Sequence, residues 1–184
     1  MMIIKDNYYL FIENIKDLNI NVLKINKKIN IILRNFKINS ITEIIKYRKK
    51  CKEKRIKFYI ANNLKIVKAC KADGLYISAY NKKRYYSHFK KIGSAHNTKE
   101  INQKIKQGCE NIIFSRLFKT NYKNKSSFFG VVKFNLFINN AKNNIYPLGG
   151  INERNLLKLN MINCNGFALF SAVKKKPVIA NRLF

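Results

Sequence analysis

The chain has 184 residues, of which 47% are hydrophobic, and a formal net charge of +29. This length and apolar content predict a single domain over residues 1–184 with a sizeable core. Lysine is spread over every expected helix face, so we interpret the charge as a compositional bias that coats the surface with solvated lysines. Nucleic acid is therefore not the expected partner, and attraction of anionic, phosphorylated small molecules is a weak consequence of the charge.

The cysteines and the apolar runs indicate the cellular compartment of the protein. Cys51, Cys70, Cys109 and Cys164 are widely spaced without a C-x-x-C pair, which indicates reduced, mostly buried thiols. No apolar run reaches the roughly 18 residues of a membrane span, and the first residues lack the apolar region of a signal peptide. The sequence predicts a cytoplasmic protein that does not interact with membranes.

Eight short apolar runs are expected to form strands. In chain order they cover residues 8–12, 29–33, 56–60, 74–78, 91–95, 111–114, 144–148 and 166–170. Helical patterns alternate with them at residues 14–23, 40–54, 64–70, 82–89, 98–107, 132–141 and 151–162. The runs are continuously hydrophobic, which is typical of parallel strands buried on both faces.

This alternation predicts an α/β fold with right-handed crossovers, and eight units favour a compact single-domain (β/α)8 TIM barrel over an open sheet. No G-x-G-x-x-G motif follows the first strand, which is evidence against a dinucleotide-binding fold. Residues 173–184 are too few and too interrupted by proline for a full helix, so the last helix is expected to be short or incomplete.

Two local signals predict helix ends. Ser40 and Glu43 have the spacing of a capping box at the start of the helix expected over residues 40–54. Gly108 follows the helix expected over residues 98–107 and is typical of a helix stop.

Polar residues follow the expected strands, and in a barrel these strand ends share one face, where active sites lie. The set is Arg34, Asn62, Asn63, Ser94, His96, Thr120, Lys123, Gly149, Gly150 and Ser171. The loops after strands seven and eight, Gly149-Gly150 and Ser171-Ala172, are the common place for a phosphate in this fold, since glycine lets the backbone approach a ligand closely. Each residue alone is equally compatible with an ordinary turn, cap or surface role.

The order and spacing of several segments resemble the thiamine phosphate synthase and TenI superfamily of barrels. The segments are residues 61–64, 72–76 (A-D-G-L-Y, similar to the family's A-D-G-V-H), 93–97, 114–123, 148–151 and 166–172. The resemblance runs from about residue 32 to residue 173. It implies an enzyme of thiamine biosynthesis.

The family synthase joins hydroxymethylpyrimidine diphosphate to thiazole phosphate and releases pyrophosphate with the help of Mg²⁺. The residues implied to hold the thiazole phosphate are Gly149, Gly150, Ser171 and Ala172. The residues implied to lie at the pyrimidine diphosphate are Arg34, Asn62 and Ser94, with Thr120 and Lys123 facing the diphosphate or thiazole side. Lys123 would neutralise charge on the leaving pyrophosphate.

The chain departs from the family at the metal. The family's strand-two motif Q-x-R-x-K reads I-L-R-N-F here, so only Arg34 remains. Asn63 takes the place of the family's Mg²⁺ aspartate, and no carboxylate lies near Tyr80 and Asn81, where the second is expected. Because Mg²⁺ prefers carboxylate oxygens, we predict no protein metal site, keep Asn63 as a substrate-binding residue, and expect Mg²⁺ only through the substrate diphosphate.

Two alternatives remain open. The same departures suit a TenI-like thiazole tautomerase, which needs no metal and for which the resemblance implies His96 as acid and base. The other is a non-catalytic protein that binds a phosphate ligand or RNA through its charge. The sequence is compatible with a homo-oligomer and does not decide the oligomeric state.

Overall fold

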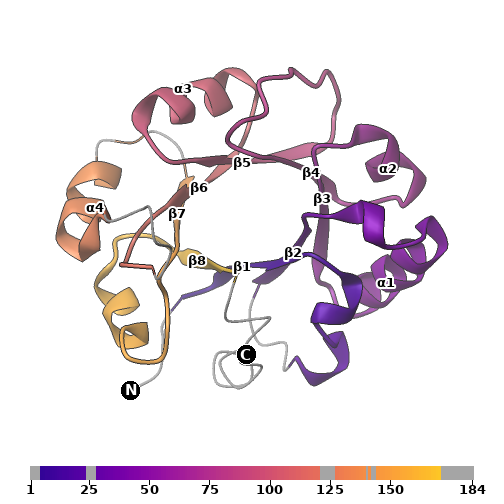
Figure 1. Cartoon of the computed structure of the whole chain (residues 1–184), viewed down its shortest axis with the longest axis horizontal. Helices are drawn as coiled ribbons and strands as arrows, with labels where there is room; N and C mark the ends of the chain where they lie inside the picture. Colours follow the sequence, from indigo (N-terminus) through magenta and orange to yellow (C-terminus); the bar gives the residue numbers. More distant parts are fainter. Residues whose placement is uncertain (1–4, 24–27, 121–126, 140, 142–143, 171–184) are drawn as a thin grey trace.

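The computed structural model describes residues 5–23, 28–120, 127–139, 141 and 144–170. Its eight parallel strands close into a barrel in which each strand pairs with its neighbours in chain order (Figure 1). The strands are β1 (Asn7–Ile12), β2 (Lys28–Leu33), β3 (Lys57–Ala61), β4 (Gly74–Ile77), β5 (Lys90–Ala95), β6 (Asn111–Ser115), β7 (Asn144–Leu148) and β8 (Gly166–Leu169). The predicted (β/α)8 barrel is confirmed; the short last helix of that prediction lies outside the described residues.

The helices form an outer ring around the barrel (Figure 1). They are α1 (Ile41–Glu53), α2 (Leu64–Ala69), α3 (Thr98–Lys106) and α4 (Gly130–Asn139). Short 3₁₀ turns complete the ring: η1 (Ile15–Asp17), η2 (Ile20–Val22), η3 (Phe36–Ile38) and η4 (Leu156–Met161). None of the helices in the described part of the chain is both long enough and apolar enough to span a membrane.

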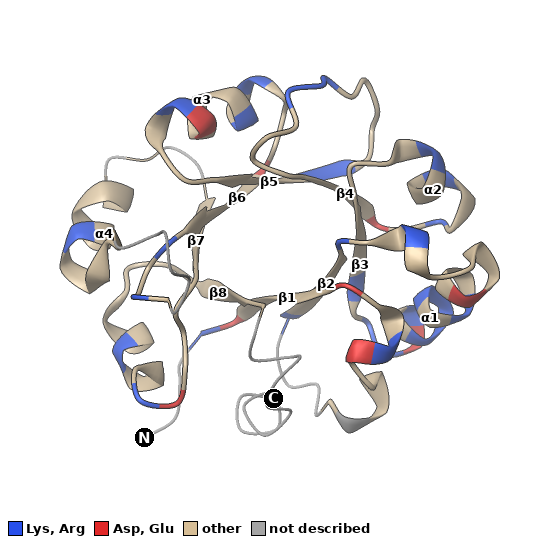
Figure 2. Cartoon of the chain, viewed as in Figure 1, with Lys and Arg blue, Asp and Glu red and all other residues tan. Residues whose placement is uncertain are grey.

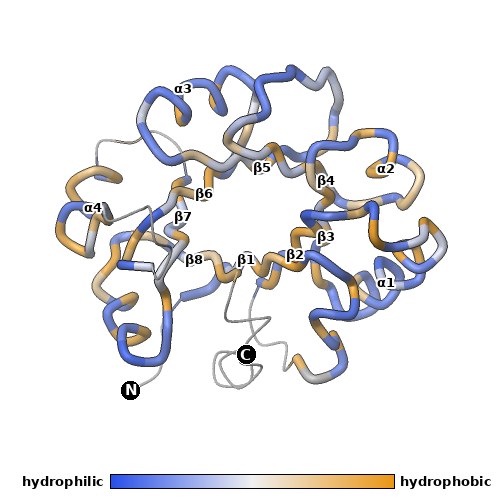
Figure 3. The backbone as a smooth tube through the Cα atoms, in the orientation of Figure 1, coloured by the Kyte–Doolittle hydropathy of each residue, from blue (hydrophilic) through white to orange (hydrophobic). Residues whose placement is uncertain are grey.

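The strands are hydrophobic on both faces because the barrel has two cores. Tyr9, Ile32 and Tyr76 point into the barrel, whereas their neighbours in sequence, such as Tyr8 and Ile31, pack beneath the helices. Figure 3 shows apolar residues along the strands, whereas α3 on the outside is mainly hydrophilic and α4 mainly apolar. This double burial explains the continuous apolar runs of the sequence.

The local signals for helix ends are confirmed. The Ser40 hydroxyl accepts from the Glu43 N–H, and a Glu43 carboxylate oxygen accepts from the Ser40 N–H, so both partners of the capping box are present. Gly108 follows the end of α3 with φ of 77°, a conformation that glycine adopts without strain. Gly166 is also required, since a Cβ there would collide with the backbone carbonyl of Asn7 where β8 closes against β1.

Three helix predictions are wrong. Residues 82–89 form no helix, because the carbonyls of Asn81 and Lys83 accept hydrogen bonds from Lys104 and Gln107 of the next βα unit. Residues 14–23 form only the turns η1 and η2, each capped by an asparagine that favours short turns. The helix expected over residues 151–162 is reduced to η4.

Candidate active site

The carboxyl end of the barrel has an aromatic floor. The Phe11 ring meets the Tyr76 ring edge-on, with centroids 5.3 Å apart, and meets the Phe170 ring at 6.2 Å. The guanidinium carbon of Arg34 lies 4.8 Å from the centroid of the Phe170 ring. Arg34 is exposed. The strand ends therefore combine flat apolar surface with a cation held above it, an arrangement suited to a flat, negatively charged ligand.

Ser94 joins this floor from β5. Its side chain is almost buried and points into the barrel, near the phenol of Tyr76. Burial raises the pKa of Tyr76 to about 12, although hydrogen bonding to Ser94 and the positive charge of Arg34 lower it. Tyr76 is thus a neutral donor at pH 7, and the predicted residues Arg34 and Ser94 lie around the same phenol.

Asn62 ties the ends of β3 and β4 together. It has φ of 57°, and its Oδ1 accepts from the backbone N–H of Ser78 at 3.0 Å and from Nδ2 of Asn81 at 2.8 Å. The Tyr85 hydroxyl donates to the Asn62 carbonyl at 3.1 Å. The amide of Asn62 is therefore committed to the loop after β4, and it reaches a ligand only in concert with that loop.

Asn63 caps the helix that follows. Its side-chain oxygen accepts from the backbone N–H of Ile66 at 3.1 Å, at the first turn of α2. An asparagine with this role stabilises the helix start, so the residue in the position of the family's metal aspartate has a structural partner here.

His96 forms a pair with a carboxylate. Its Nδ1 lies 3.0 Å from Oε2 of Glu100, and its backbone N–H donates to the same oxygen at 2.8 Å. Partial burial raises the pKa of Glu100, but hydrogen bonds from the His96 backbone and ring, with the His96 charge, lower it overall. The imidazole is about half exposed, with a side-chain exposure of 52%, so a ligand can reach it.

The loops after β6 and β7 are fastened to each other. Backbone N–H groups of Leu117 and Phe118 donate to the carbonyls of Leu148 and Gly149, at 3.0 Å each. Gly149 and Gly150 have φ of 100° and 71°. The Gly150 carbonyl accepts from Nδ2 of Asn155 at 2.8 Å, which turns this oxygen toward η4 and away from a ligand.

Thr120 extends the same pair of loops. Its hydroxyl accepts from the Arg116 guanidinium at 3.2 Å, and Arg116 also packs against Gly149. Arg116 thus contacts both Thr120 and Gly149, and that these residues form one side of a binding site stays a prediction. Lys123, Ser171 and Ala172 lie outside the described residues.

The described carboxylates do not assemble a metal site. No group of three or more His, Cys, Asp and Glu side chains in the described ranges lies close enough to hold an ion. The amides of Asn62, Asn63 and Asn81 occupy this region instead, each with a protein partner. Mg²⁺ prefers carboxylate oxygens, so these residues do not fit a protein-held Mg²⁺.

Sequence reasoning missed three members of the site. Phe11, Tyr76 and Phe170 form the aromatic floor, and Arg34 lies over Phe170, yet the sequence places all three only in buried strands. The period-two alternation of a strand offers a signal for Tyr76, because it places Tyr76 and Ser78 on one face toward the strand end. No such signal identifies Phe170 before the barrel is known to be closed.

A barrel with polar strand ends on one face belongs to a broad class of α/β enzymes. Residues 19–173 match the family model described as Thiamine monophosphate synthase. The chain therefore belongs to the thiamine monophosphate synthase and TenI family, as the sequence resemblance predicted.

Two curated relatives carry the same name. The thiamine-phosphate synthase of Prochlorococcus marinus subsp. pastoris is 30% identical over 173 residues, 86% of this chain and 48% of that protein. That of Prochlorococcus marinus strain SARG is 28% identical over 142 residues, 72% of this chain and 40% of that protein. The chain thus spans about half the length of the curated relatives that it matches.

Solved structures share the fold. Thiamine phosphate pyrophosphorylase from Pyrococcus furiosus superposes with a TM-score of 0.76 at 16% identity, covering 97% of this chain and 93% of that one. 3-keto-L-gulonate-6-phosphate decarboxylase from Vibrio cholerae superposes with a TM-score of 0.62 at 10% identity, covering 97% and 95%. Since proteins named for different reactions share this barrel, the fold alone does not define the reaction.

Proposed function

We propose that the chain is a thiamine-phosphate-synthase-like transferase, which joins hydroxymethylpyrimidine diphosphate to thiazole phosphate and releases pyrophosphate. Membership of the family carries this proposal. Arg34 over an aromatic ring and the Gly149-Gly150 turn lie at the same end of the barrel, which supports the proposal. The matched relatives that bear the synthase name are about twice as long, so the activity of the whole relative is part of the proposal.

The aromatic floor suits the pyrimidine. A flat ring can lie against Phe11, Tyr76 or Phe170, while the Tyr76 phenol and Ser94 hydroxyl offer hydrogen bonds to ring nitrogens or an amino group. Arg34 would hold the diphosphate attached to that ring. As the carbon–oxygen bond to the diphosphate breaks, negative charge grows on the leaving oxygens, and the Arg34 guanidinium stabilises it.

The turn after β7 suits the thiazole phosphate. Both glycines have left-handed backbone, and hydrogen bonds from Phe118 and Asn155 hold the carbonyls of Gly149 and Gly150 against the protein. A turn held in this way can direct backbone N–H groups at a phosphate. Thr120, and the sequence-predicted Lys123, Ser171 and Ala172, would complete this side.

In the part of the chain that the structure describes, no carboxylates gather into a cage for Mg²⁺. We therefore propose that any Mg²⁺ enters bound to the diphosphate oxygens of the substrate. Arg34 and the sequence-predicted Lys123 would then supply the protein's positive charge at the diphosphate. Phosphorylated small molecules are the proposed substrates.

The test is product formation. Purified chain is incubated with hydroxymethylpyrimidine diphosphate and thiazole phosphate, with and without Mg²⁺, and thiamine phosphate is measured by fluorescence after oxidation. The proposal predicts thiamine phosphate in the Mg²⁺ sample and a loss of about 10- to 100-fold with Arg34→Gln. No product in either sample, while thiazole phosphate still binds, would reject the synthase.

A second candidate is the TenI-like tautomerase. The His96–Glu100 pair favours it, because a carboxylate at Nδ1 orients the imidazole so that Nε2 can exchange a proton with a substrate. This reading expects proton exchange on the thiazole carboxylate phosphate without metal. His96→Asn would abolish that exchange, whereas it would leave thiamine phosphate synthesis within a few-fold of the unchanged chain.

A further inference from the structure

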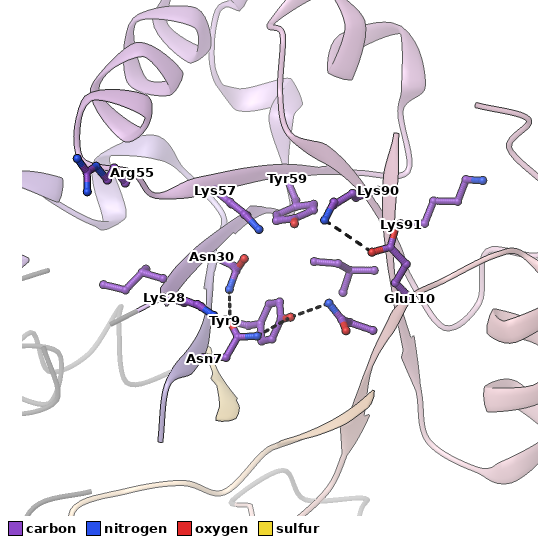
Figure 4. A pocket seen from close by; sticks show the side chains of 13 residues that line it. Asn7, Tyr9, Lys28, Asn30, Arg55, Lys57, Tyr59, Lys90, Lys91 and Glu110 are labelled. Carbon is purple, nitrogen blue, oxygen red and sulfur yellow. Dashed lines mark hydrogen bonds and ion pairs between the residues drawn. The ribbon is translucent and has the colours of Figure 1, made fainter. Parts of the chain in front are cut away.

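A cavity of about 220 Å³ opens at the amino-terminal end of the barrel, opposite the candidate active site (Figure 4). Lys28, Lys57 and Lys90 line it, and they are the first residues of β2, β3 and β5. Asn7 and Asn111 line it from the first residues of β1 and β6. Parallel strands start on the same face of a barrel, so these residues meet although they are far apart in sequence.

The charges around the cavity are not balanced. In Figure 4 the ammonium groups of Lys57 and Lys90 point toward its middle, whereas Arg55 and Lys91 extend away from it. Glu110 is the one carboxylate among the described residues that line it, and it lies 3.9 Å from the Lys90 ammonium. With Lys28 included, the cavity gathers more positive charge than one carboxylate can compensate.

The floor of the cavity is rigid and polar. Nδ2 of Asn30 donates to Oδ1 of Asn7, and Nδ2 of Asn111 donates to the Tyr9 hydroxyl at 3.0 Å. Nδ2 of Asn7 donates to the Tyr146 hydroxyl at 3.1 Å. These bonds link β1, β2, β6 and β7, so the floor needs no ligand to keep its shape.

An uncharged donor joins the lysine ammonium groups at the cavity. The Tyr59 hydroxyl points into it in Figure 4, from a ring that is almost fully buried. Burial, and then the charges of Asp73 and Glu110, raise the pKa of Tyr59 far above its usual value. The hydroxyl therefore stays protonated and can donate to an anion that the lysines attract.

From this geometry we propose that the amino-terminal cavity is a second anion site, which binds a small multivalent oxyanion of the phosphate or diphosphate class. Concave walls focus the field of Lys28, Lys57 and Lys90 on a volume that holds one or two phosphate groups. The cavity is enclosed by strand ends, and its tyrosines Tyr9 and Tyr59 are buried, so it offers no stacking surface for a nucleic-acid strand. This site does not depend on the reaction proposed for the other end.

The experiment compares two double variants that have the same net charge but lose their lysines at different places. Inorganic diphosphate is titrated by calorimetry, without Mg²⁺, into the unchanged chain, into the double variant Lys57→Gln/Lys90→Gln, and into the control Lys65→Gln/Lys99→Gln. The control lysines are exposed on α2 and α3. We expect at least a 10-fold loss of affinity in the cavity variant and less than a 2-fold change in the control.

A third variant tests whether removing a negative charge from the cavity strengthens diphosphate binding. Glu110→Gln removes the opposing carboxylate, so diphosphate should bind about 2- to 5-fold more tightly, an effect that general damage to the fold does not produce. Thermal melting of each variant confirms that it is folded. Equal losses in the cavity and control variants would mean that only the bulk charge acts, and unchanged binding in the cavity variant would place diphosphate elsewhere; either result overturns the proposal.

Two further ligands distinguish a small-anion site from a nucleic-acid surface. Inorganic phosphate should bind more weakly than diphosphate to the same variants in the same order, because it carries less charge. If instead the cavity variant loses binding of a single-stranded oligonucleotide and keeps that of diphosphate, the cavity belongs to a nucleic-acid surface and the small-anion site is rejected.

Discussion

The two ends of the barrel use polar residues in different ways. At the carboxyl end, Asn62 and Asn63 bond to the protein itself, and Arg34 is held over an aromatic ring. At the amino end, Lys57 and Lys90 line a cavity in which Glu110 is the one carboxylate among the described lining residues. Figure 2 shows lysine and arginine over the outer helices as well, so the number of cations says little about function in this chain. What distinguishes an end is the geometry in which its cations are held.

The largest effect is expected at the carboxyl end, from Gly150→Ala. A Cβ there would collide with the backbone of Phe118 and Lys119, at a φ of 71° that already disfavours alanine. We expect a loss of about 3 kcal/mol in the free energy of unfolding, and roughly 100-fold lower activity because the turn is displaced. Urea unfolding and the synthase assay measure the two effects.

Gly130→Ala is the matched control. Gly130 has φ of 69°, but nothing lies within 4 Å of the added Cβ, so it carries the backbone strain without the collision. It should cost only about 1 kcal/mol. Equal effects of the two substitutions would show that the close approach of the two loops is unimportant.

The second effect concerns the buried lysine beneath the carboxyl end. The Lys104 side chain is fully buried, and its Nζ donates to the carbonyls of Ser78 and Asn81 and to Oε1 of Gln107, at 2.7–3.0 Å. Burial lowers the pKa of Lys104, although the charges of Cys109 and Glu100 raise it. Lys104→Met would remove three hydrogen bonds at once; the carbonyls of Ser78 and Asn81 would keep donors from the Asn81 N–H and Gln107 Nε2, but Oε1 of Gln107 would lose its donor, so we expect about 2 kcal/mol of destabilisation.

The rate of proteolysis in the loop after β4 measures how strongly Lys104 holds that loop. Trypsin should cut at Lys82, Lys83 and Arg84 faster in Lys104→Met, because the loop keeps its bonds to Gln107 but loses those to the Lys104 ammonium. The exposed neighbour Lys106→Met is the control and should leave the cleavage rate unchanged. A loop equally resistant in both variants would contradict the anchoring role.

The fate of that loop shows what the sequence could predict. The strands were predictable, because each apolar run is buried on both faces. The loop over residues 82–89 was not, because the bonds that hold it extended come from Lys104 and Gln107, about twenty residues later in the chain. Local helical spacing cannot reveal such a competition, and tertiary bonds prevail over propensity.

The sites were predictable in the same uneven way. The sequence places Arg34 and Gly149 at the carboxyl end of the barrel, because each directly follows a strand; that they bind a ligand stays a prediction. The amino-terminal lysines were not predictable, because Lys57 and Lys90 look like any other member of the lysine coat until the barrel closes. Lys123, Ser171 and Ala172 lie outside the described residues, and the roles of all the candidate site residues stay predictions.

A smaller effect on activity is expected when one arginine at each end of the barrel is substituted. Arg34→Gln should lower kcat/KM about 10- to 100-fold, since it removes a charge-assisted contact to the diphosphate. Arg55→Gln, at the amino end, should leave kcat/KM unchanged. Both residues are exposed, so stability should stay within about 0.5 kcal/mol. A similar drop for both arginines would mean that net charge, and not position, supports catalysis.

The smallest expected effect is absent at neutral pH: the folded state loses stability only in alkaline solution. Burial raises the pKa of Cys51 to about 12 and that of Cys109 to about 11, above the ordinary thiol value of 9.0. The unfolded thiols ionise from about pH 9 while the folded ones keep their protons, so stability falls as pH rises from 9 to 12. At pH 10 each thiol should cost about 1 kcal/mol.

Urea unfolding at pH 8, 9 and 10 measures this slope. Cys51→Ala should flatten it, and Cys164→Ala, at a partly exposed thiol, should change it less. Identical slopes in all three proteins would show that the buried thiols do not control alkaline stability.

The most direct test of the account is a crystal structure of the chain with thiazole phosphate. We predict phosphate density at the Gly149-Gly150 turn, with the thiazole ring directed toward the aromatic floor of Phe11, Tyr76 and Phe170. Density at the amino-terminal cavity alone, with the carboxyl end empty, would contradict the assignment of the active site to the strand ends.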